Sequence, residues 1–410
     1  MAFKPKCPEK SPIYCEQNTL SRGLCVPKAT DCNIRANSPR NIPIYEINPL
    51  GSKYGYRDSP DLGKHCYYTN MTMTLNYTQK FDGAEEIPSK FSCVTYNIWG
   101  LPKNKDIKHL IDLRKPLLEK TIRGVDADIL CLQEISSFAY NKLQGLFSEF
   151  KFVSEIPYPE NGANRRNRVV DVFLLSKYTP AAIYIYGLEG VLGYTNSLMV
   201  VEYPNLTIFN LYNQAGSKSS PGQAEKWLHY SRCRYDILQS IYDLIKSTFS
   251  GAKQYIICGD FNFHLDGTVV DWPEMEMIEK FKQDGFVDTY RNINSDPGYT
   301  EDTDLNKMRW NQKLIEKFYR FDAILYKGPL TVKKSELIGL EEMCLSKEDS
   351  EWFIDNLSDA KGIRRNELKR CKEGIPINPS DHFGVLTWFG PRAGGRKLRQ
   401  NKTKKNKVQK

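Results

Sequence analysis

The sequence lacks any apolar run that approaches the roughly 20 residues of a membrane-spanning helix. The stretch from Met1 to Cys7 also lacks the apolar core of a secretory signal. From these two absences we expect a soluble chain without a signal peptide. At 410 residues, the chain is long enough for one large domain with smaller appendages.

The body of the chain lacks an excess of either charge. Of the 58 basic residues, nine lie between Arg392 and Lys410, where there is no acid, and the remaining 49 balance the 49 acidic residues. Because affinity for nucleic-acid backbones comes from clustered cations, this balance argues against a body that coats nucleic acid. The tail at 391–410 is too polar to fold and is expected to be disordered. It could contact nucleic acid, contact an anionic surface, or only solubilise the chain.

Residues 1–88 lack a sustained helical or strand period and are rich in Pro, Asn, Ser and Tyr, so we expect a separate cysteine-rich extension. Four of the 11 cysteines fall within 26 residues: Cys7, Cys15, Cys25 and Cys32. Their spacing is not Cys-x-x-Cys and no histidine lies among them, which disfavours zinc. Two disulfides, with three possible pairings, and a poorly ordered arm with free thiols are the alternatives. By contrast, Cys93, Cys131 and Cys258 sit in apolar stretches and are expected to be buried thiols.

Disulfides need an oxidising setting, which conflicts with the missing signal peptide. The Cys-Pro opening and the later Gly-x-Cys are similar to short cysteine modules of giant-virus proteins. That resemblance implies a virion or a host cytoplasm as the location, with assembly supplying its own oxidation.

The most informative stretch is residues 255–262, Tyr-Ile-Ile-Cys-Gly-Asp-Phe-Asn. Its first four residues are uncharged and indicate a buried strand too short to be a helix. The chain then turns at Gly259 and continues with Asp260 and Asn262. Because these two residues are two positions apart, both side chains can face one site. For this motif alone, a turn that merely closes a strand is the alternative.

Five other strand-like stretches carry polar residues at one end. They are 91–96 followed by Asn97, 128–132 followed by Gln133-Glu134, 207–211 followed by Tyr212-Asn213-Gln214, 321–326 with Arg320 and Asp322, and 383–389 preceded by Ser380-Asp381-His382. Helical spacing of apolar residues predicts helices ending near Gly124, over 225–249, and from about 271 to Gly285. This order of strands and helices predicts a layered α/β architecture. Residues 327–378 are weakly periodic and are expected to be surface insertions.

The order Asn, Gln-Glu, Gly-Asp-Phe-Asn, Arg-Phe-Asp and Ser-Asp-His resembles the endonuclease/exonuclease/phosphatase superfamily. This superfamily includes DNase I, abasic-site endonucleases and neutral sphingomyelinases. The resemblance covers about residues 89–389. It implies a DNase I-like four-layered α/β sandwich, with two packed mixed sheets flanked by helices, in a domain at 89–390. It also implies a monomeric, metal-dependent phosphodiesterase.

The resemblance implies a metal site and a phosphate site. Glu134 would be the main ligand of Mg²⁺, for which Mn²⁺ could substitute, with Asn97 and Asp381 on the same side. Oxygen ligands suit such a hard cation, which would act as a Lewis acid and stabilise the leaving group.

The catalytic roles follow from the same resemblance. Asp260 would deprotonate or align the attacking water, and Asn262 would hold the phosphate or the base. His382 would pair with Asp322, stay cationic, and donate a hydrogen bond to the phosphate.

Tyr212 departs from the family pattern. Sphingomyelinases and DNase-like members carry a His in the strand end Asn-Thr-His-Leu-Gln-Ala, whereas residues 210–215 read Asn-Leu-Tyr-Asn-Gln-Ala. Abasic-site endonucleases use a Tyr there. A phenol can donate one hydrogen bond to phosphate but is not cationic near neutral pH. A core tyrosine with a satisfied hydroxyl is the alternative.

Three residues are predicted to contact the substrate: Asn213, Arg320 and Arg168. Arg168 belongs to an arginine-rich stretch at 165–168, which is either a phosphate-attracting rim or a solvated loop. Arg320 could instead pair with Asp322.

Three hypotheses for function follow. The first is a sphingomyelinase-like phospholipid hydrolase, favoured by Gln214-Ala215, by Gly298-Tyr-Thr300 and by the neutral body. The second is a DNA endonuclease, exonuclease or end-processing enzyme steered by the basic tail. The third is a catalytically idle structural or packaging protein on the same fold.

Overall fold

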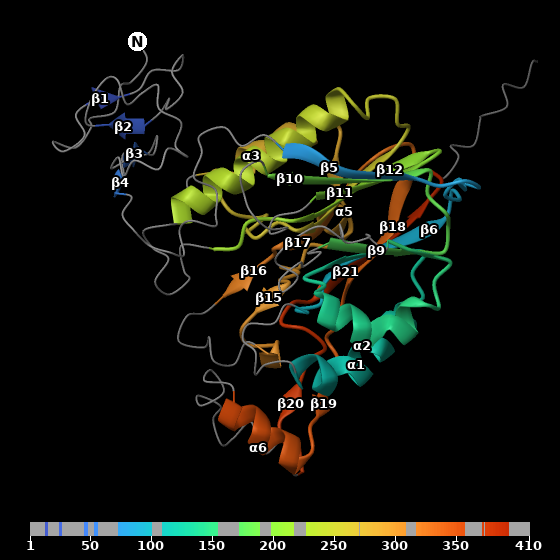
Figure 1. Ribbon diagram of the computed structural model, residues 1–410, viewed down its shortest axis with the longest axis vertical. Coiled ribbons are helices and arrows are strands. Elements are labelled where there is room, and N and C mark those ends of the chain that lie inside the picture. Colours follow the sequence, from blue (N-terminus) through green and yellow to red (C-terminus); the bar gives the residue numbers. More distant parts are fainter. Residues whose placement is uncertain are drawn as a thin grey trace, which may run out of the picture.

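Two mixed β-sheets packed face to face, with helices outside both, make up the body of the protein (Figure 1). The computed structural model describes residues 13–14, 24–26, 45–47, 53–55, 73–100, 109–154, 172–188, 198–216, 227–269, 271–308, 317–356, 371–372 and 374–392. The predicted disulfides of the N-terminal cysteines, the arginines at 165–168 and the tail at 393–410 lie outside the described residues.

The larger sheet has seven strands in the order β14-β17-β13-β12-β11-β10-β5. Their bounds are β5 Met73–Lys80, β10 Ala182–Leu188, β11 Leu198–Tyr203, β12 Leu206–Tyr212, β13 Tyr255–Asp260, β14 Val287–Asp288 and β17 Asp322–Lys327. β12 and β13 run parallel, and the other neighbours are antiparallel. The apolar runs had predicted β12, β13 and β17. β5 falls in the segment that the sequence assigned to the N-terminal extension, yet it pairs with β10.

The second sheet has six strands in the order β18-β21-β6-β7-β9-β8. Their bounds are β6 Phe91–Asn97, β7 Ile129–Gln133, β8 Phe152–Val153, β9 Val172–Ser176, β18 Thr331–Ile338 and β21 Gly384–Gly390. β18 corrects the expectation that residues 327–378 are all surface insertions. It was missed because it is an edge strand with exposed lysines in its middle, which break the apolar pattern.

Helices cover the outer face of each sheet (Figure 1). α3 (Trp227–Lys246) and α4 (Met275–Gln283) pack on the seven-stranded sheet, whereas α1 (His109–Val125) and α2 (Ser137–Phe147) pack on the six-stranded sheet. The expected four-layered α/β sandwich is therefore confirmed. α1 ends one residue beyond Gly124, and the left-handed residue after it is Asp126, with φ 42°.

The core between the sheets is apolar and includes the three expected buried thiols. Cys93, Cys131 and Cys258 are free and fully buried there, together with aliphatic side chains such as Ile208 and Ile256. Strands that are buried on both faces read as continuous apolar runs, which is why they were visible in the sequence.

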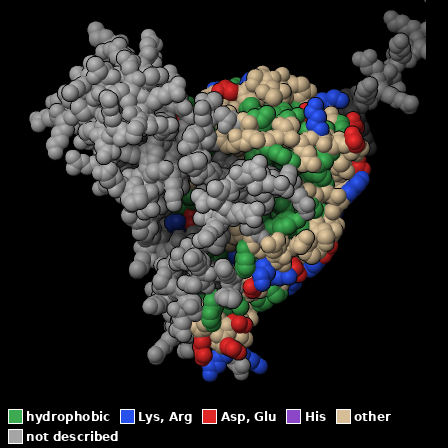
Figure 2. Space-filling model, viewed as in Figure 1, with side chains coloured by type: hydrophobic (Ala, Val, Ile, Leu, Met, Phe, Trp, Pro, Cys, Tyr) green, Lys and Arg blue, Asp and Glu red, His purple; other side chains and the backbone are tan. Residues whose placement is uncertain are grey.

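Smaller elements surround this body. They are α5 (Thr289–Ile293), a hairpin of β15 (Glu301–Asp302) and β16 (Phe318–Tyr319), and an N-terminal sheet of β1 (Ile13–Tyr14), β2 (Leu24–Val26), β3 (Tyr45–Ile47) and β4 (Lys53–Gly55). No helix in the described part of the chain is long and apolar enough to cross a membrane. On the face shown in Figure 2, acidic and basic side chains of the described residues are interspersed, in line with the balanced charge of the body.

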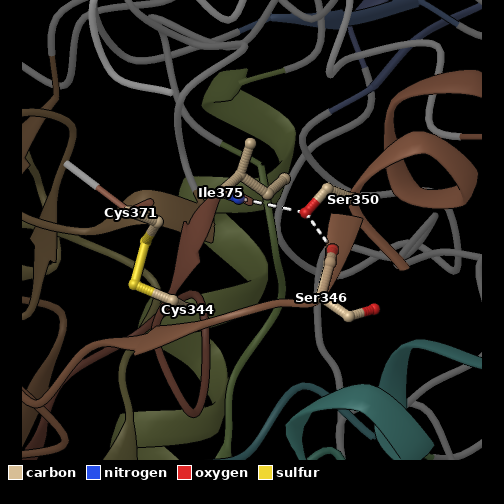
Figure 3. Close-up of a disulfide and its surroundings, with 5 residues drawn as sticks. All are labelled: Cys344, Ser346, Ser350, Cys371 and Ile375. Atoms are coloured by element: carbon tan, nitrogen blue, oxygen red, sulfur yellow. Dashed lines mark hydrogen bonds between the residues drawn. A yellow bond between two sulfur atoms is a disulfide. The ribbon is translucent and has the colours of Figure 1, made fainter. Parts of the chain in front are cut away.

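A disulfide closes a small unit whose apolar residues pack against Trp99 and Leu113. This unit contains β19 (Met343–Cys344), α6 (Lys347–Asn356) and β20 (Pro376–Ile377), and the bond joins Cys344 to Cys371 (Figure 3). Ser350 Oγ accepts a hydrogen bond from Ile375 N at 3.0 Å and donates one to Ser346 O at 2.6 Å. The disulfide was not predicted, because its two cysteines lie 27 residues apart in a weakly periodic segment.

Candidate active site

The polar strand ends predicted from the sequence meet at one edge of the sandwich. Each sheet has a parallel pair, β6–β7 and β12–β13, and parallel strands end at the same edge. β13 of one sheet packs on β6 of the other, so the ends of both pairs lie close together. β17 runs antiparallel to β13 and begins where β13 ends, with Asp322 opposite Asp260.

Asn97 connects the two sheets at this edge. Its Nδ2 donates to Glu134 Oε1 and to Asp260 Oδ2, both at 3.0 Å. Tyr212 adds a hydrogen bond from its hydroxyl to Glu134 Oε1 at 2.9 Å. Two predicted site residues, Asn97 and Tyr212, therefore bind the Glu134 carboxylate from different sheets, and Asn97 also binds Asp260. Asn97 Oδ1 accepts from Trp99 N at 2.9 Å.

His382 and Asp322 form the second part of the cluster. His382 Nδ1 lies 2.8 Å from Asp322 Oδ2, and His382 Nε2 lies 4.0 Å from Asp260 Oδ2. The structure therefore contains the predicted pair of His382 and Asp322. Ligand atoms of these three residues all lie within 4.8 Å of one another, a spacing that could hold a metal ion.

Backbone strain concentrates around this cluster. Four described non-glycine residues have positive φ, and three of them flank the site: Trp99 at 52°, Glu134 at 58° and Asn262 at 56°. Non-glycine residues in this region cost of order 1–3 kcal/mol each and are typical of functional sites. Gly259, with φ 143°, has no room for a side chain, because a Cβ there would lie 1.9 Å from Leu211 O. The turn that carries Asp260 and Asn262 therefore requires this glycine.

The pKa of His382 is raised. Burial by itself lowers the pKa of an imidazole, but the carboxylates of Asp322 and Asp260 oppose it and raise the pKa of His382 to about 10. The side chain is thus an imidazolium at neutral pH, which agrees with the predicted cationic role.

The pKa values of two acids are raised as well. Burial raises the pKa of Asp260 to about 8, and the neighbouring Asp322 adds to the shift. Burial, followed by the charge of Asp381, also raises the pKa of Glu134. Both shifts show that burial and neighbouring carboxylates disfavour the charged form of these two acids.

The charge balance of this cluster fits a divalent cation. The cluster gathers four carboxylates, on Glu134, Asp260, Asp322 and Asp381. Two cations, His382 and Arg114, act on them. When all six groups are ionised, four negative and two positive charges leave two negative charges, which one divalent cation neutralises. Carboxylate oxygens are also the ligands that Mg²⁺ prefers.

Comparison with known proteins places the chain in a family. A model of the Endonuclease/Exonuclease/phosphatase family matches residues 94–382. The chain belongs to this family. The family comprises phosphoric ester hydrolases, which generally use divalent metals.

Individual relatives are distant. An uncharacterized protein of Caenorhabditis elegans is 24% identical over 279 residues, which cover 63% of this chain and 84% of that protein. Among solved structures, C. elegans TDP2 matches with a TM-score of 0.49 and 19% identity, over 73% of this chain and 75% of that one. D. rerio TDP2, complexed with single-strand DNA product, matches with a TM-score of 0.44 and 17% identity, over 74% of this chain and all (100%) of that one.

Not every predicted substrate contact of the family domain lies in the cluster. Asn213 is fully buried beside it, and its backbone carbonyl accepts from Asn262 Nδ2 at 2.9 Å. Arg168 lies outside the described residues. Arg320 is 1% exposed and forms ion pairs with Asp266 at 2.9 Å and Asp288 at 2.6 Å. Arg320 therefore does not form the alternative pair with Asp322, which pairs with His382 instead.

The ion pairs of Asp266 lead to a prediction on acid stability. Burial raises the pKa of Asp266, but hydrogen bonds from Arg291 and Arg320 overcome this and hold the pKa well below its usual range. A lowered folded-state pKa stabilises the fold above the unfolded pKa of about 3.9, and the effect is lost as the pH falls through the folded pKa. We expect Asp266→Asn to lower the free energy of unfolding at pH 7 by about 1.5–3 kcal/mol.

Urea unfolding of both proteins from pH 7 to pH 2 measures this effect. The difference between wild type and Asp266→Asn should shrink steadily below about pH 4. A difference that stays constant over this range would contradict the assigned ion pairs.

Three buried polar residues to which the sequence assigned no role lie on the strands that lead to the site. Gln133 Nε2 donates to Asn210 Oδ1 at 2.8 Å across the two sheets, and Thr95 joins them through its hydroxyl. All three are fully buried. Their signal in the sequence was a polar residue inside an otherwise apolar strand.

A turn from outside the sandwich also supports the site. Thr300 Oγ1 accepts from Asp322 N at 3.0 Å and from Phe321 N at 2.9 Å. The carbonyl of Thr300 accepts from Phe383 N at 2.8 Å. Thr300 therefore ties the start of β17 to the residue that follows His382.

Proposed function

We propose that the chain is a divalent-metal-dependent phosphodiesterase that hydrolyses a phosphoric ester by in-line attack of water. The observation that carries the proposal is the hydrogen-bonded cluster in which Asn97 joins Glu134 of one sheet to Asp260 of the other, with the Asp322–His382 pair 4.0 Å away. Hydrolysis needs an oriented water and neutralisation of phosphoryl charge, and this cluster has a group for each task.

Asp260 is the residue that takes the proton from the attacking water. Its Oδ1 accepts from Asn262 N at 2.8 Å and its Oδ2 from Asn97, so the carboxylate is held in one orientation. With a pKa raised to about 8, the ionised carboxylate is a better base than an ordinary aspartate, and its ionised fraction increases as the pH rises toward 8. The charge of His382 lowers the pKa of Asp260 and so favours the ionised form.

His382 stabilises the phosphoryl oxygens. Asp322 binds Nδ1, which leaves Nε2 directed toward the side of Asp260. A fixed imidazolium of this kind donates a charge-assisted hydrogen bond to an oxygen that gains charge in the transition state.

Glu134, together with Asn97 and Asp381, would hold Mg²⁺ or Mn²⁺. The cation would supply Lewis acidity and stabilise the leaving oxygen. Tyr212 orients Glu134 through its hydrogen bond, so a single carboxylate oxygen of this half-buried residue is fixed by both Tyr212 and Asn97.

For the substrate, Tyr212 favours a nucleic-acid ester over a choline phospholipid. A histidine at this strand end would add a second cation, as in the sphingomyelinases that the motif resembles. The tyrosine keeps the position neutral, as in abasic-site endonucleases. Among the neighbours of similar fold, D. rerio TDP2 was solved with a single-strand DNA product. A sphingomyelinase-like activity stays the second candidate, through Gln214-Ala215 and Gly298-Tyr-Thr300.

The test is hydrolysis by the purified full chain in Mg²⁺ and in EDTA. The panel comprises single-stranded, nicked, abasic and end-blocked DNA, together with sphingomyelin vesicles. Metal-dependent cleavage of DNA supports the favoured substrate, and cleavage of sphingomyelin alone supports the second. If no substrate turns over and calorimetry detects no binding of Mg²⁺ or Mn²⁺, the proposal fails and the idle structural or packaging protein takes its place.

Glu134→Gln is expected to weaken Mg²⁺ binding at least about tenfold, because it replaces a charged ligand while keeping a side chain of the same length. Isothermal titration with Mg²⁺ and Mn²⁺ measures the effect. Glu119→Gln is the matched control, since Glu119 pairs with Arg123 on the outer surface of α1. Equal Mg²⁺ affinity of wild type and Glu134→Gln would reject Glu134 as a ligand.

A further inference from the structure

Arg114 is a fully buried arginine on α1 that the sequence reasoning did not single out. It is 1% exposed, and no carboxylate pairs with it directly among the described residues. Its guanidinium faces main-chain carbonyls instead. It donates to Ile98 O at 3.0 Å, to Trp99 O at 2.9 Å and to Pro379 O. Burying a charge in this way is costly unless the geometry of its partners matches its donors.

These carbonyls belong to the two loops that carry the site. Ile98 and Trp99 directly follow Asn97, whereas Pro379 directly precedes the Ser380-Asp381-His382 turn. The two loops are separated by more than half the chain and are not joined through a β-ladder at these residues. One guanidinium therefore ties both loops to α1.

Side-chain hydrogen bonds hold the carbonyl of Asn97 and those of the three described residues that follow it. Ser380 Oγ donates to Asn97 O at 2.7 Å, Arg114 binds the next two carbonyls, and Ser136 Oγ donates to Gly100 O at 2.5 Å. Four successive carbonyls thus receive side-chain hydrogen bonds. Trp99 lies within this stretch in the left-handed region, with φ 52°, so these bonds hold a strained conformation that other contacts must stabilise.

A guanidinium suits this task better than an ammonium. Its donors form a rigid planar fork that can reach several acceptors at once, whereas lysine carries one point charge on a flexible chain. The Arg114 guanidinium also lies 5.2 Å from the centre of the Trp99 ring, which fixes its plane further.

We propose that Arg114 is a positioning residue, which sets the spacing between the Asn97 loop and the Asp381–His382 turn and thereby assembles the metal site. This inference rests on the proposed function. Its consequence is specific, because the loss of Arg114 would move Asn97 and Asp381 relative to each other without removing any predicted ligand.

Whether an Arg114 variant binds the metal more weakly or more tightly distinguishes a positioning role of Arg114 from a purely electrostatic one. Arg114 is a cation near the carboxylates of Asp381 and Glu134, so its removal would tighten binding of Mg²⁺ if charge alone mattered. If Arg114 positions the loops, Arg114→Met instead weakens binding by about 10–100-fold, as is typical when groups that orient metal ligands are lost. Arg114→Lys keeps the charge but not the fork, so it should weaken binding as well.

The experiment measures the Mg²⁺ and Mn²⁺ dissociation constants by calorimetry, the Tm in EDTA, and kcat at saturating metal. The matched control is Leu118→Ala, because Leu118 lies on the same helix, is fully buried, and belongs to the apolar core under the six-stranded sheet. We expect both variants to lose Tm, but only the Arg114 variants to lose metal affinity and, by about 100-fold, kcat.

Two results would overturn the inference. One is an Arg114→Met protein that binds Mg²⁺ as tightly as wild type, or more tightly, with a Tm loss like that of Leu118→Ala. The other is a wild-type chain that binds neither cation, which removes the proposed function and this inference with it. If Arg114→Met does not fold, Arg114→Lys is judged by the same comparison.

Discussion

Asp260→Asn is expected to lower kcat by about 10²–10⁴-fold and, at the same time, to raise the Tm of the metal-free protein. The loss of kcat follows because an amide cannot take the proton from water. The gain in stability follows because burial, and then the charge of Asp322 opposite it in the sheet, raise the pKa of Asp260 to about 8. An acid with a raised folded-state pKa destabilises the fold as the pH rises above its unfolded pKa of about 3.9. The neutral amide removes this cost.

Single-turnover kinetics with Mg²⁺ and thermal unfolding in EDTA at pH 7.5 measure the two effects. Asp243→Asn is the control, because Asp243 is an exposed acid on α3. It should change neither kcat nor Tm appreciably. Undiminished turnover of Asp260→Asn would remove Asp260 from the mechanism. A lower Tm in EDTA would mean that Asp260 is stabilised in the fold, against the assigned repulsion.

His382→Gln is expected to lower kcat by about 10²–10³-fold, since one preorganised donor to the phosphoryl oxygens is lost. Asp322→Asn tests the pair in a different way, through the pH dependence. In the wild type, the imidazolium persists as the pH rises until it reaches the folded pKa of about 10. The imidazolium that activity needs should therefore be lost only as the pH approaches 10.

Burial lowers the pKa of His382 and is the largest influence on it, and Asp322→Asn removes the carboxylate that opposes burial most, while Asp260 and Asp381 remain. In Asp322→Asn the alkaline decline should therefore move to a lower pH than in the wild type. The measurement is kcat from pH 5.5 to pH 9.5 at saturating Mg²⁺, with a ¹⁵N NMR titration of His382 in EDTA as an independent readout. An unshifted alkaline limb, together with an unshifted NMR titration, would reject the pairing as the source of the imidazolium.

The local pattern of apolar and polar residues was sufficient to predict much of the fold. Strands such as β13 are buried on both faces, so their apolar runs are short, continuous and bounded by polar residues. The helices α1 and α3 show the spacing of one buried stripe. Edge elements carry no such signal, which is why β18, with its exposed lysines, was missed.

The sequence alone predicted the strand ends from which the candidate site is built, because polar residues stand there in the order of a family to which the chain belongs. Only the tertiary structure decided how they pair. Asn97 contacts Asp260 across 163 residues of chain, and Arg320 pairs with Asp266 and Asp288 instead of Asp322. The hydrogen bonds from Arg114 to the two loops are a third case, since nothing in the neighbouring sequence distinguishes Arg114 from other helical arginines. The physical reason is that periodicity reports which face of an element is buried, whereas partners depend on how two sheets stack.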